Sequence, residues 1–145
     1  MPKRILVALD RTTSPYTLLD VIGDAVRGSG ATVRLMHVAD APDSVTDRTG
    51  RVVVYSDQET ARVEAEAMDA LRAFEVHLPP ESVDSVVRFG DPATEILREA
   101  EAFDADLIAM PATCHAPILR LLFGGVAEKV ARRAPMPVLL LRPAE

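Results

Sequence analysis

The chain has 145 residues, of which 48% are hydrophobic and 26% charged, and its net charge is −6. These values predict one compact domain over residues 1–145; they exclude a disordered chain and argue against a general nucleic-acid binder. The first apolar run, residues 5–9, is too short for a signal-peptide core or a membrane span, and the single cysteine fits a reducing compartment. We therefore expect a cytoplasmic protein with no membrane segment.

Short apolar or β-branched runs, bounded by Asp, Gly or Pro, predict five β-strands at residues 5–9, 32–39, 83–89, 106–110 and 138–141. Segments with the helical period lie between them, at residues 18–26, 63–74, 96–103 and 126–134. Gly28 and Gly30 follow the first helix, and Asp91 with Pro92 forms an N-cap and first-turn pair. The alternation predicts a doubly wound α/β domain with a parallel sheet and helices on both faces.

One long connection, residues 40–55, interrupts this regular alternation. Connections of that length are often functional. Within it, residues 52–55 (VVVY) indicate either an extra strand or a lid.

In open α/β sheets a ligand binds outside the carboxyl ends of the strands, where the winding direction reverses. That rule places Asp10, after the first strand, opposite the segment that starts at Met110, after the fourth. Asp10 could contact a ribose or cap the first helix. The segment ends at Gly124 and Gly125, which either form a simple turn or leave helix N–H groups open to an anion.

Several motifs, in this order and spacing, resemble the universal stress proteins. They are ILVALD at 5–10, LMHV at 35–38, V-x-x-G-x-P-x-x-x-I at 87–96, ADLIAM at 105–110, GGVAEKV at 124–130 and APMPVLL at 134–140. The resemblance implies the strand order 3-2-1-4-5 of an adenine nucleotide alpha hydrolase-like fold. It also implies a homodimer through the last strand, Val138–Leu141, an apolar edge that invites pairing.

The ATP-binding branch of that family carries a loop of the form Gly-x-x-Gly-x9-Gly-Ser/Thr. In this chain Pro111, Cys114, Gly124 and Gly125 stand at those positions. Pro111 lacks an N–H, Cys114 adds a Cβ, and Gly125 lacks the hydroxyl, so three of the four positions have changed. The candidate nucleotide pocket implied by the resemblance consists of Asp10, Val38, Pro111, Cys114, Gly124, Gly125 and Val126.

We therefore expect a non-enzymatic stress-response protein with an altered nucleotide-binding loop. The alternative is a true ATP or AMP binder, with slow hydrolysis, that uses the Gly124-Gly125 helix start. Cys114 and His115 are neighbours, but adjacent side chains on an extended chain point apart, which favours an inert thiol over a catalytic one. His37 and His77 lie in distant segments, so no metal site is expected, and His37 is interpreted as a packing residue.

Overall fold

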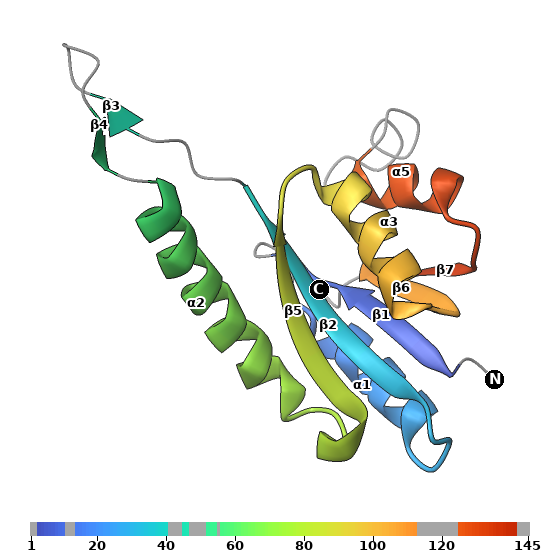
Figure 1. Cartoon of the computed structure of the whole chain (residues 1–145). Coiled ribbons are helices and arrows are strands. Elements are labelled where there is room, and N and C mark those ends of the chain that lie inside the picture. The colour runs from blue at the N-terminus through green and yellow to red at the C-terminus, as the bar shows by residue number, and fades with distance from the viewer. Residues whose placement is uncertain are drawn as a thin grey trace.

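A computed structural model of the chain describes residues 3–10, 14–40, 45–46, 52–54, 56–112 and 125–141. Its centre is a five-stranded, all-parallel sheet in the order β5-β2-β1-β6-β7 (Figure 1). In chain order these strands follow the predicted arrangement 3-2-1-4-5, which is confirmed. The strands are β1 (Arg4–Ala8), β2 (Thr32–Ala39), β5 (Val83–Phe89), β6 (Leu107–Pro111) and β7 (Val138–Leu141).

Two of these strands lie one residue away from the predicted bounds. β1 ends at Ala8 rather than at residue 9, and β6 runs on to Pro111. Proline remains in β6 because the strand continues to pair with β7, where Ala112 donates its N–H to the carbonyl of Leu141 at 2.8 Å. The segment that sequence reasoning treated as loop from residue 111 onward therefore starts inside the sheet.

Helices cover both faces of the sheet, as predicted. α1 (Tyr16–Val26) and α2 (Ser56–Glu75) pack on one face, and α3 (Pro92–Phe103) and α5 (Val126–Arg133) pack on the other (Figure 1). A short 3-10 turn, η1 (Pro80–Ser82), leads into β5. Alternate strand side chains face opposite layers, so each face has its own core. The first includes Val7, Leu19, Ile22, Leu35 and Leu71, and the second includes Leu6, Met36, Ile96, Ile108 and Val130.

The predicted helix ends agree with the backbone geometry. Gly28 and Gly30 follow α1 with φ of 75° and 76°, a left-handed conformation that favours glycine. Asp91 is the N-cap of α3, and its side chain accepts the Thr94 N–H at 3.0 Å. The N-cap of α1 is Pro15, which makes no side-chain cap hydrogen bond, and the interpretation of Asp10 as a cap of the first helix stays a prediction.

The long connection contains a short antiparallel pair, β3 (Val45–Thr46) with β4 (Val52–Val54). The extra strand expected within residues 52–55 is therefore present, and the lid stays a prediction.

A network of ion pairs joins α3 to β2 and β5. Glu99 is 4% exposed and accepts hydrogen bonds from Arg34 Nη1 at 2.9 Å and Arg88 Nε at 2.8 Å. Arg34 also pairs with Asp84 through two nitrogens, both at 3.0 Å. The hydrogen bonds that Arg34 donates to Asp84, followed by the one to Glu99, raise the pKa of Arg34 despite its partial burial. The network fixes α3 to the strands below it.

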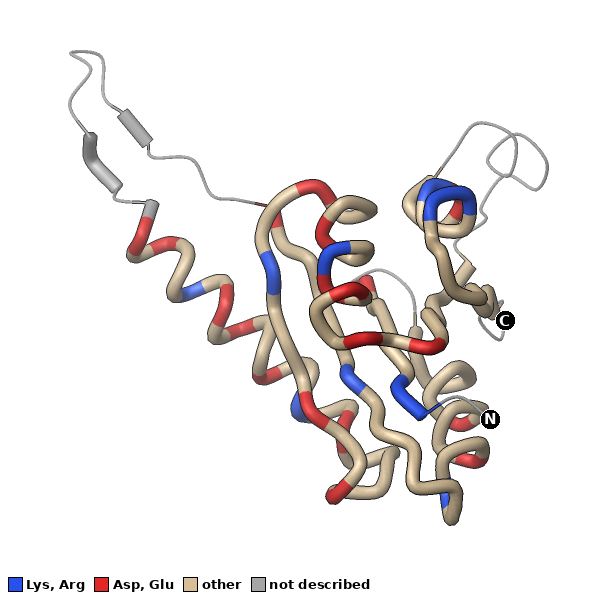
Figure 2. Tube along the Cα trace, turned by 45° about the vertical axis from the view of Figure 1, so that its right-hand side comes forward, with Lys and Arg blue, Asp and Glu red and all other residues tan. Residues whose placement is uncertain are grey.

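Charges are distributed unevenly over the helices (Figure 2). α5 carries Lys129, Arg132 and Arg133 on its exposed surface, whereas the first turn of α2 carries Asp57 and Glu59. Within the described residues, no helix is both long and apolar enough to cross a membrane.

Candidate functional site

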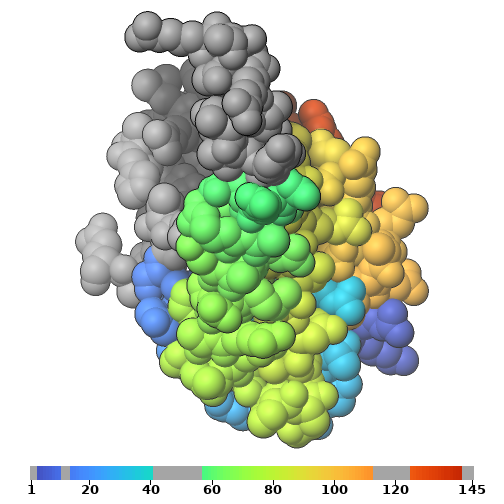
Figure 3. All heavy atoms as spheres, turned by 60° about the vertical axis from the view of Figure 1, so that its left-hand side comes forward, coloured from blue at the N-terminus to red at the C-terminus, as the bar shows by residue number. Residues whose placement is uncertain are grey.

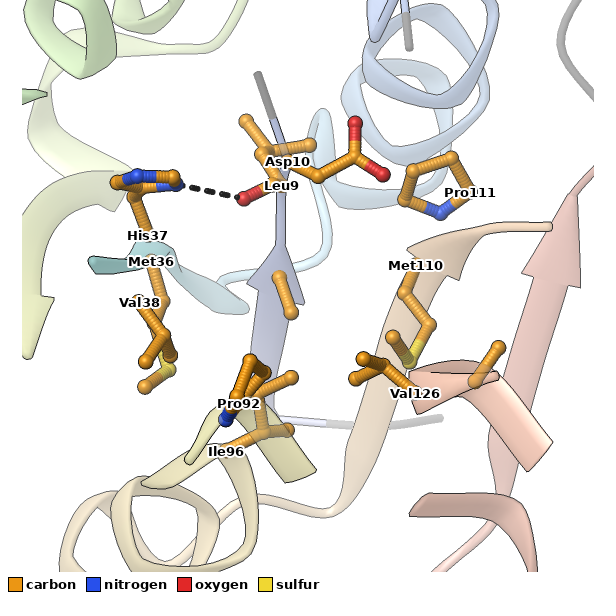
Figure 4. Close-up of a pocket in the computed structure, with 12 residues that line it drawn as sticks. Leu9, Asp10, Met36, His37, Val38, Pro92, Ile96, Met110, Pro111 and Val126 are labelled. Carbon is orange, nitrogen blue, oxygen red and sulfur yellow. Dashed lines mark hydrogen bonds between the residues drawn. The ribbon is translucent and has the colours of Figure 1, made fainter. Parts of the chain in front are cut away.

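A cavity of about 160 Å³ opens at the carboxyl ends of β1, β2 and β6, between the sheet and the starts of α3 and α5 (Figure 4). This is the position that the strand order predicts for a ligand, because β2 and β6 lie on opposite sides of β1 and the winding reverses there. The lining residues are Ala8, Leu9, Asp10, Met36, His37, Val38, Pro92, Ile96, Met110, Pro111, Val126 and Ala127.

Four of the residues selected from the sequence line this one cavity: Asp10, Val38, Pro111 and Val126. They come from four separate segments of the chain. Gly125 directly precedes α5 as its N-cap. The remaining two candidates, Cys114 and Gly124, lie outside the described residues.

The floor of the cavity is apolar and was not anticipated from the sequence. Met36, Ile96 and Met110 are buried, and their side chains lie below the rim formed by Asp10 and Pro111 (Figure 4). The sequence does indicate the place of Met36 and Met110. Because side chains alternate between the two faces of a strand, both are expected on the α3 and α5 face, near the carboxyl ends of their strands. An apolar floor with a few polar rim groups is typical of a small-molecule pocket.

Pro111 removes a hydrogen-bond donor from the cavity. In β6 the N–H groups of Ile108 and Ala112 both donate to carbonyls on the β7 side, at 3.1 and 2.8 Å. Because alternate N–H groups of a strand point to opposite neighbours, an N–H at position 111 would point toward β1. There β1 has already ended, and Leu9 and Asp10 line the cavity. Proline therefore leaves no N–H on the β1 side of β6 at this edge of the cavity.

Two helices begin at this cavity, and they differ in how their first N–H groups are satisfied. At α3, Asp91 Oδ2 accepts from the Thr94 hydroxyl at 2.7 Å and from its N–H at 3.0 Å, and these two bonds, in that order, lower the pKa of Asp91. At α5, the N-cap is Gly125, which has no side chain, and the first helical bond is Lys129 N–H to the Gly125 carbonyl at 3.2 Å. Among the described residues, no side chain is seen to cap the N–H groups of the first turn of α5, so these groups can bind an anion.

His37 was interpreted from the sequence as a packing residue, and the structure adds a hydrogen bond to the backbone. Its Nδ1 lies 3.2 Å from the Leu9 carbonyl, at the end of β1 (Figure 4). A carbonyl only accepts, so Nδ1 carries the proton of the neutral ring. His37 thus stabilises the turn that leads to Asp10.

The described residues include no group of three or more His, Cys, Asp or Glu side chains that could hold a metal ion.

The model of the Universal stress protein family matches residues 1–142. The chain belongs to this family. The protein YxiE of Bacillus subtilis, a universal stress protein, is 25% identical over 148 residues, covering 98% of this chain and all of that protein. A universal stress protein of Methanothermobacter thermautotrophicus is 42% identical over 64 residues, a match that covers 44% of this chain and only 43% of that relative.

Solved structures of the family share the fold. The structure described as that of hypothetical protein MJ0577 has a TM-score of 0.78, with 23% identity over 99% of this chain and 97% of the other. A universal stress protein in complex with cAMP has a TM-score of 0.66 at 17% identity, covering 99% and 100%. One from Archaeoglobus fulgidus in complex with dAMP has a TM-score of 0.58 at 20% identity, covering 96% and 97%. Each of these likenesses supports the fold alone.

Proposed function

We propose that this member of the family is a cytoplasmic, non-enzymatic stress-response protein whose cavity binds an adenine nucleoside monophosphate more tightly than ATP. The observation that carries the proposal is the position of Pro111, which lines the cavity with Asp10 and has no N–H on the side of β6 that faces β1. The complexes with cAMP and dAMP, which each hold one phosphate, support the ligand class.

Among the described residues that line the cavity, backbone N–H groups open to an anion lie at the start of α5. The first turn of α5, at Val126 and Ala127, can hold one phosphate through its N–H groups. At the start of α3, the Thr94 N–H already donates to Asp91. Asp10, at the exposed rim, is positioned for a ribose hydroxyl. These features favour a ligand with one phosphate over one with three.

Thermal melting with each ligand tests this proposal. A ligand at one hundred times its dissociation constant stabilises the folded state by about 2.7 kcal/mol. We expect 5 mM AMP to raise the melting temperature by several degrees and 5 mM ATP with magnesium to raise it less. A rise with ATP that exceeds the rise with AMP would support the alternative of a true ATP binder and overturn the proposed selectivity.

A double variant tests the cause of the selectivity. Pro111→Gly returns an N–H to position 111, and Gly125→Ser returns a hydroxyl to the helix start. We expect the ATP-induced shift to increase in this variant relative to its own ligand-free melting temperature. An unchanged ATP shift would show that these two positions do not set the preference. Phosphate release from ATP should stay at the background rate in both proteins.

We also propose that the protein forms a homodimer through β7. This strand ends the sheet order, and Leu140 on it is 36% exposed. Light scattering at micromolar concentration should give the mass of a dimer, and Leu140→Lys should give a monomer. A monomeric parent protein would overturn this assignment.

A further inference from the structure

A second cavity lies on the opposite side of the sheet from the first. Side chains alternate along the strands, so Met36 and Val38 face α3 and α5, whereas Leu35 and His37 face α1 and α2. On that second side a cavity of about 160 Å³ is present beneath α2, the helix that covers this face of the molecule in Figure 3. It is lined by Leu9, Asp10, His37, Ala67, Ala70, Leu71 and Phe74.

The walls of this cavity are mostly apolar. α2 presents two alanines to it, Ala67 and Ala70, where larger side chains would fill the space. Leu71 is 2% exposed and closes the inner side. The Phe74 ring makes an edge-to-face contact with the Tyr16 ring, with ring centroids 5.8 Å apart and an interplanar angle of 81°. The space therefore results from small side chains on a well-packed helix.

Two polar side chains line this cavity, those of His37 and Asp10. His37 Nδ1 bonds the Leu9 carbonyl at 3.2 Å, which places the proton of the neutral ring on Nδ1. The remaining nitrogen, Nε2, is then an acceptor, and it lies on the side of the ring away from Leu9 (Figure 4). A ligand in this cavity would meet this acceptor between apolar walls, with the carboxylate of Asp10 at the rim.

We propose that this cavity binds a single aromatic ring that carries one hydroxyl or amino donor. An apolar cavity of about 150 Å³ is large enough for one benzene ring. Phe74 supplies an aromatic contact for the ring, and His37 Nε2 accepts the hydrogen bond from its donor. Such a site is separate from the nucleotide cavity, although the two share Leu9, Asp10 and His37 at their rims.

Titration with phenol tests the proposal. With alanine methyl groups labelled for NMR, the methyls of Ala67 and Ala70 report on this cavity, and those of Ala8 and Ala127 report on the first. At pH 8, where an imidazole is neutral, we expect saturable shifts at Ala67 and Ala70 with a dissociation constant on the order of 1 mM. Saturable shifts only at Ala8 and Ala127, or none at any of the four, would overturn the proposal.

Two comparisons identify the contacts. Anisole has the same ring but no donor, and it should bind about fivefold more weakly than phenol because the bond to His37 is lost; His37→Phe should weaken phenol equally. Equal affinities for phenol and anisole would overturn the role of His37.

Ala70→Leu, at an exposed helix position that borders the cavity, should abolish phenol binding. Ala73→Leu, exposed on the same helix and outside the cavity, should retain it. Unchanged binding in Ala70→Leu would place phenol elsewhere.

Discussion

α3 and α5 both begin at the first cavity, the one lined by Asp10 and Pro111, and both pack on the same face of the sheet. They are held there by different contacts. α3 buries six side chains, two of them glutamates in ion pairs, and begins with a capping aspartate. α5 buries one side chain within the described chain, Val130, and begins at a glycine. One wall of the cavity is therefore fixed by six buried side chains, and the other by one buried side chain together with the partly buried Val126 and Ala127.

The two helices therefore contribute to the cavity in different ways. The α3 wall, with Pro92 and Ile96, keeps the shape of the apolar floor. The α5 wall, with Val126 and Ala127, presents N–H groups and can adjust to the ligand. Variants that weaken each helix should therefore have different consequences.

The largest effect should follow removal of the buried carboxylate of α3. Glu99→Ala leaves Arg34 and Arg88 without their shared partner, and breaking such a pair costs about 3 kcal/mol of unfolding free energy after allowance for the partial exposure of both arginines. Urea unfolding monitored by circular dichroism measures this loss of unfolding free energy. Glu101→Ala, exposed on the same helix, should change it by less than about 0.5 kcal/mol. A loss below about 1 kcal/mol for Glu99→Ala would mean that the network does not hold α3.

A smaller but more local effect should follow Val130→Ala. The side chain is fully buried, and its truncation should cost about 2 kcal/mol. Since it is the main attachment of α5, hydrogen exchange should accelerate in α5 more than in α3. Val76→Ala, the same change at a position that is 79% exposed, is the matched control. Equal acceleration in both helices would show that they open together.

The capping carboxylate of α3 predicts a pH-dependent effect. Asp91→Ala should lower the melting temperature by about 3 °C at pH 7 through loss of the cap. Thr94 lowers the pKa of Asp91, so the ionised cap stabilises the folded state above the ordinary aspartate pKa, and this contribution is lost as the pH falls through the lowered value. The difference between parent and variant should shrink as the pH falls below 4. A difference that stays constant down to pH 2 would contradict this role, and Asp69→Ala on the exposed side of α2 is the control.

The smallest effect should come from giving α5 the cap that α3 already has. Gly125 has φ of −78° and ψ of −177°, and a Cβ built there has no atom of the described residues within 4 Å. Gly125→Ser should therefore raise the unfolding free energy by a few tenths of a kcal/mol, measured by urea unfolding. A loss above about 1 kcal/mol would show that the space is occupied.

Local sequence signals were sufficient for the five strands of the main sheet and its helices, whereas the strand order was implied by the family resemblance. Runs of β-branched and apolar residues marked all five strands, and Asp91 with Pro92 marked the start of α3. The limits of β1 and β6 differed because they depend on pairing between strands about 100 residues apart, as at Asp106, whose N–H donates to the Arg4 carbonyl. The ion pairs of Glu99 and the methionine floor were not predicted, since they require knowledge of which strand lies under α3.

The position of Pro111 shows a similar limit. Its missing N–H was evident from the sequence, but the direction of that lost donor follows only from the pairing of β6 with both β1 and β7. A motif comparison identifies a substitution, and the sheet register determines what the substitution removes.

The central place of β1 has a consequence for folding. Its partner β2 follows within 30 residues, but its other partner, β6, is synthesised about 100 residues later. The first cavity spans this junction, with Ala8 and Met36 on the early side and Met110 and Val126 on the late side. Long-range pairings of this kind form slowly. The cavity is therefore completed only when the last third of the chain docks, so a bound nucleotide would slow the detachment of that late segment.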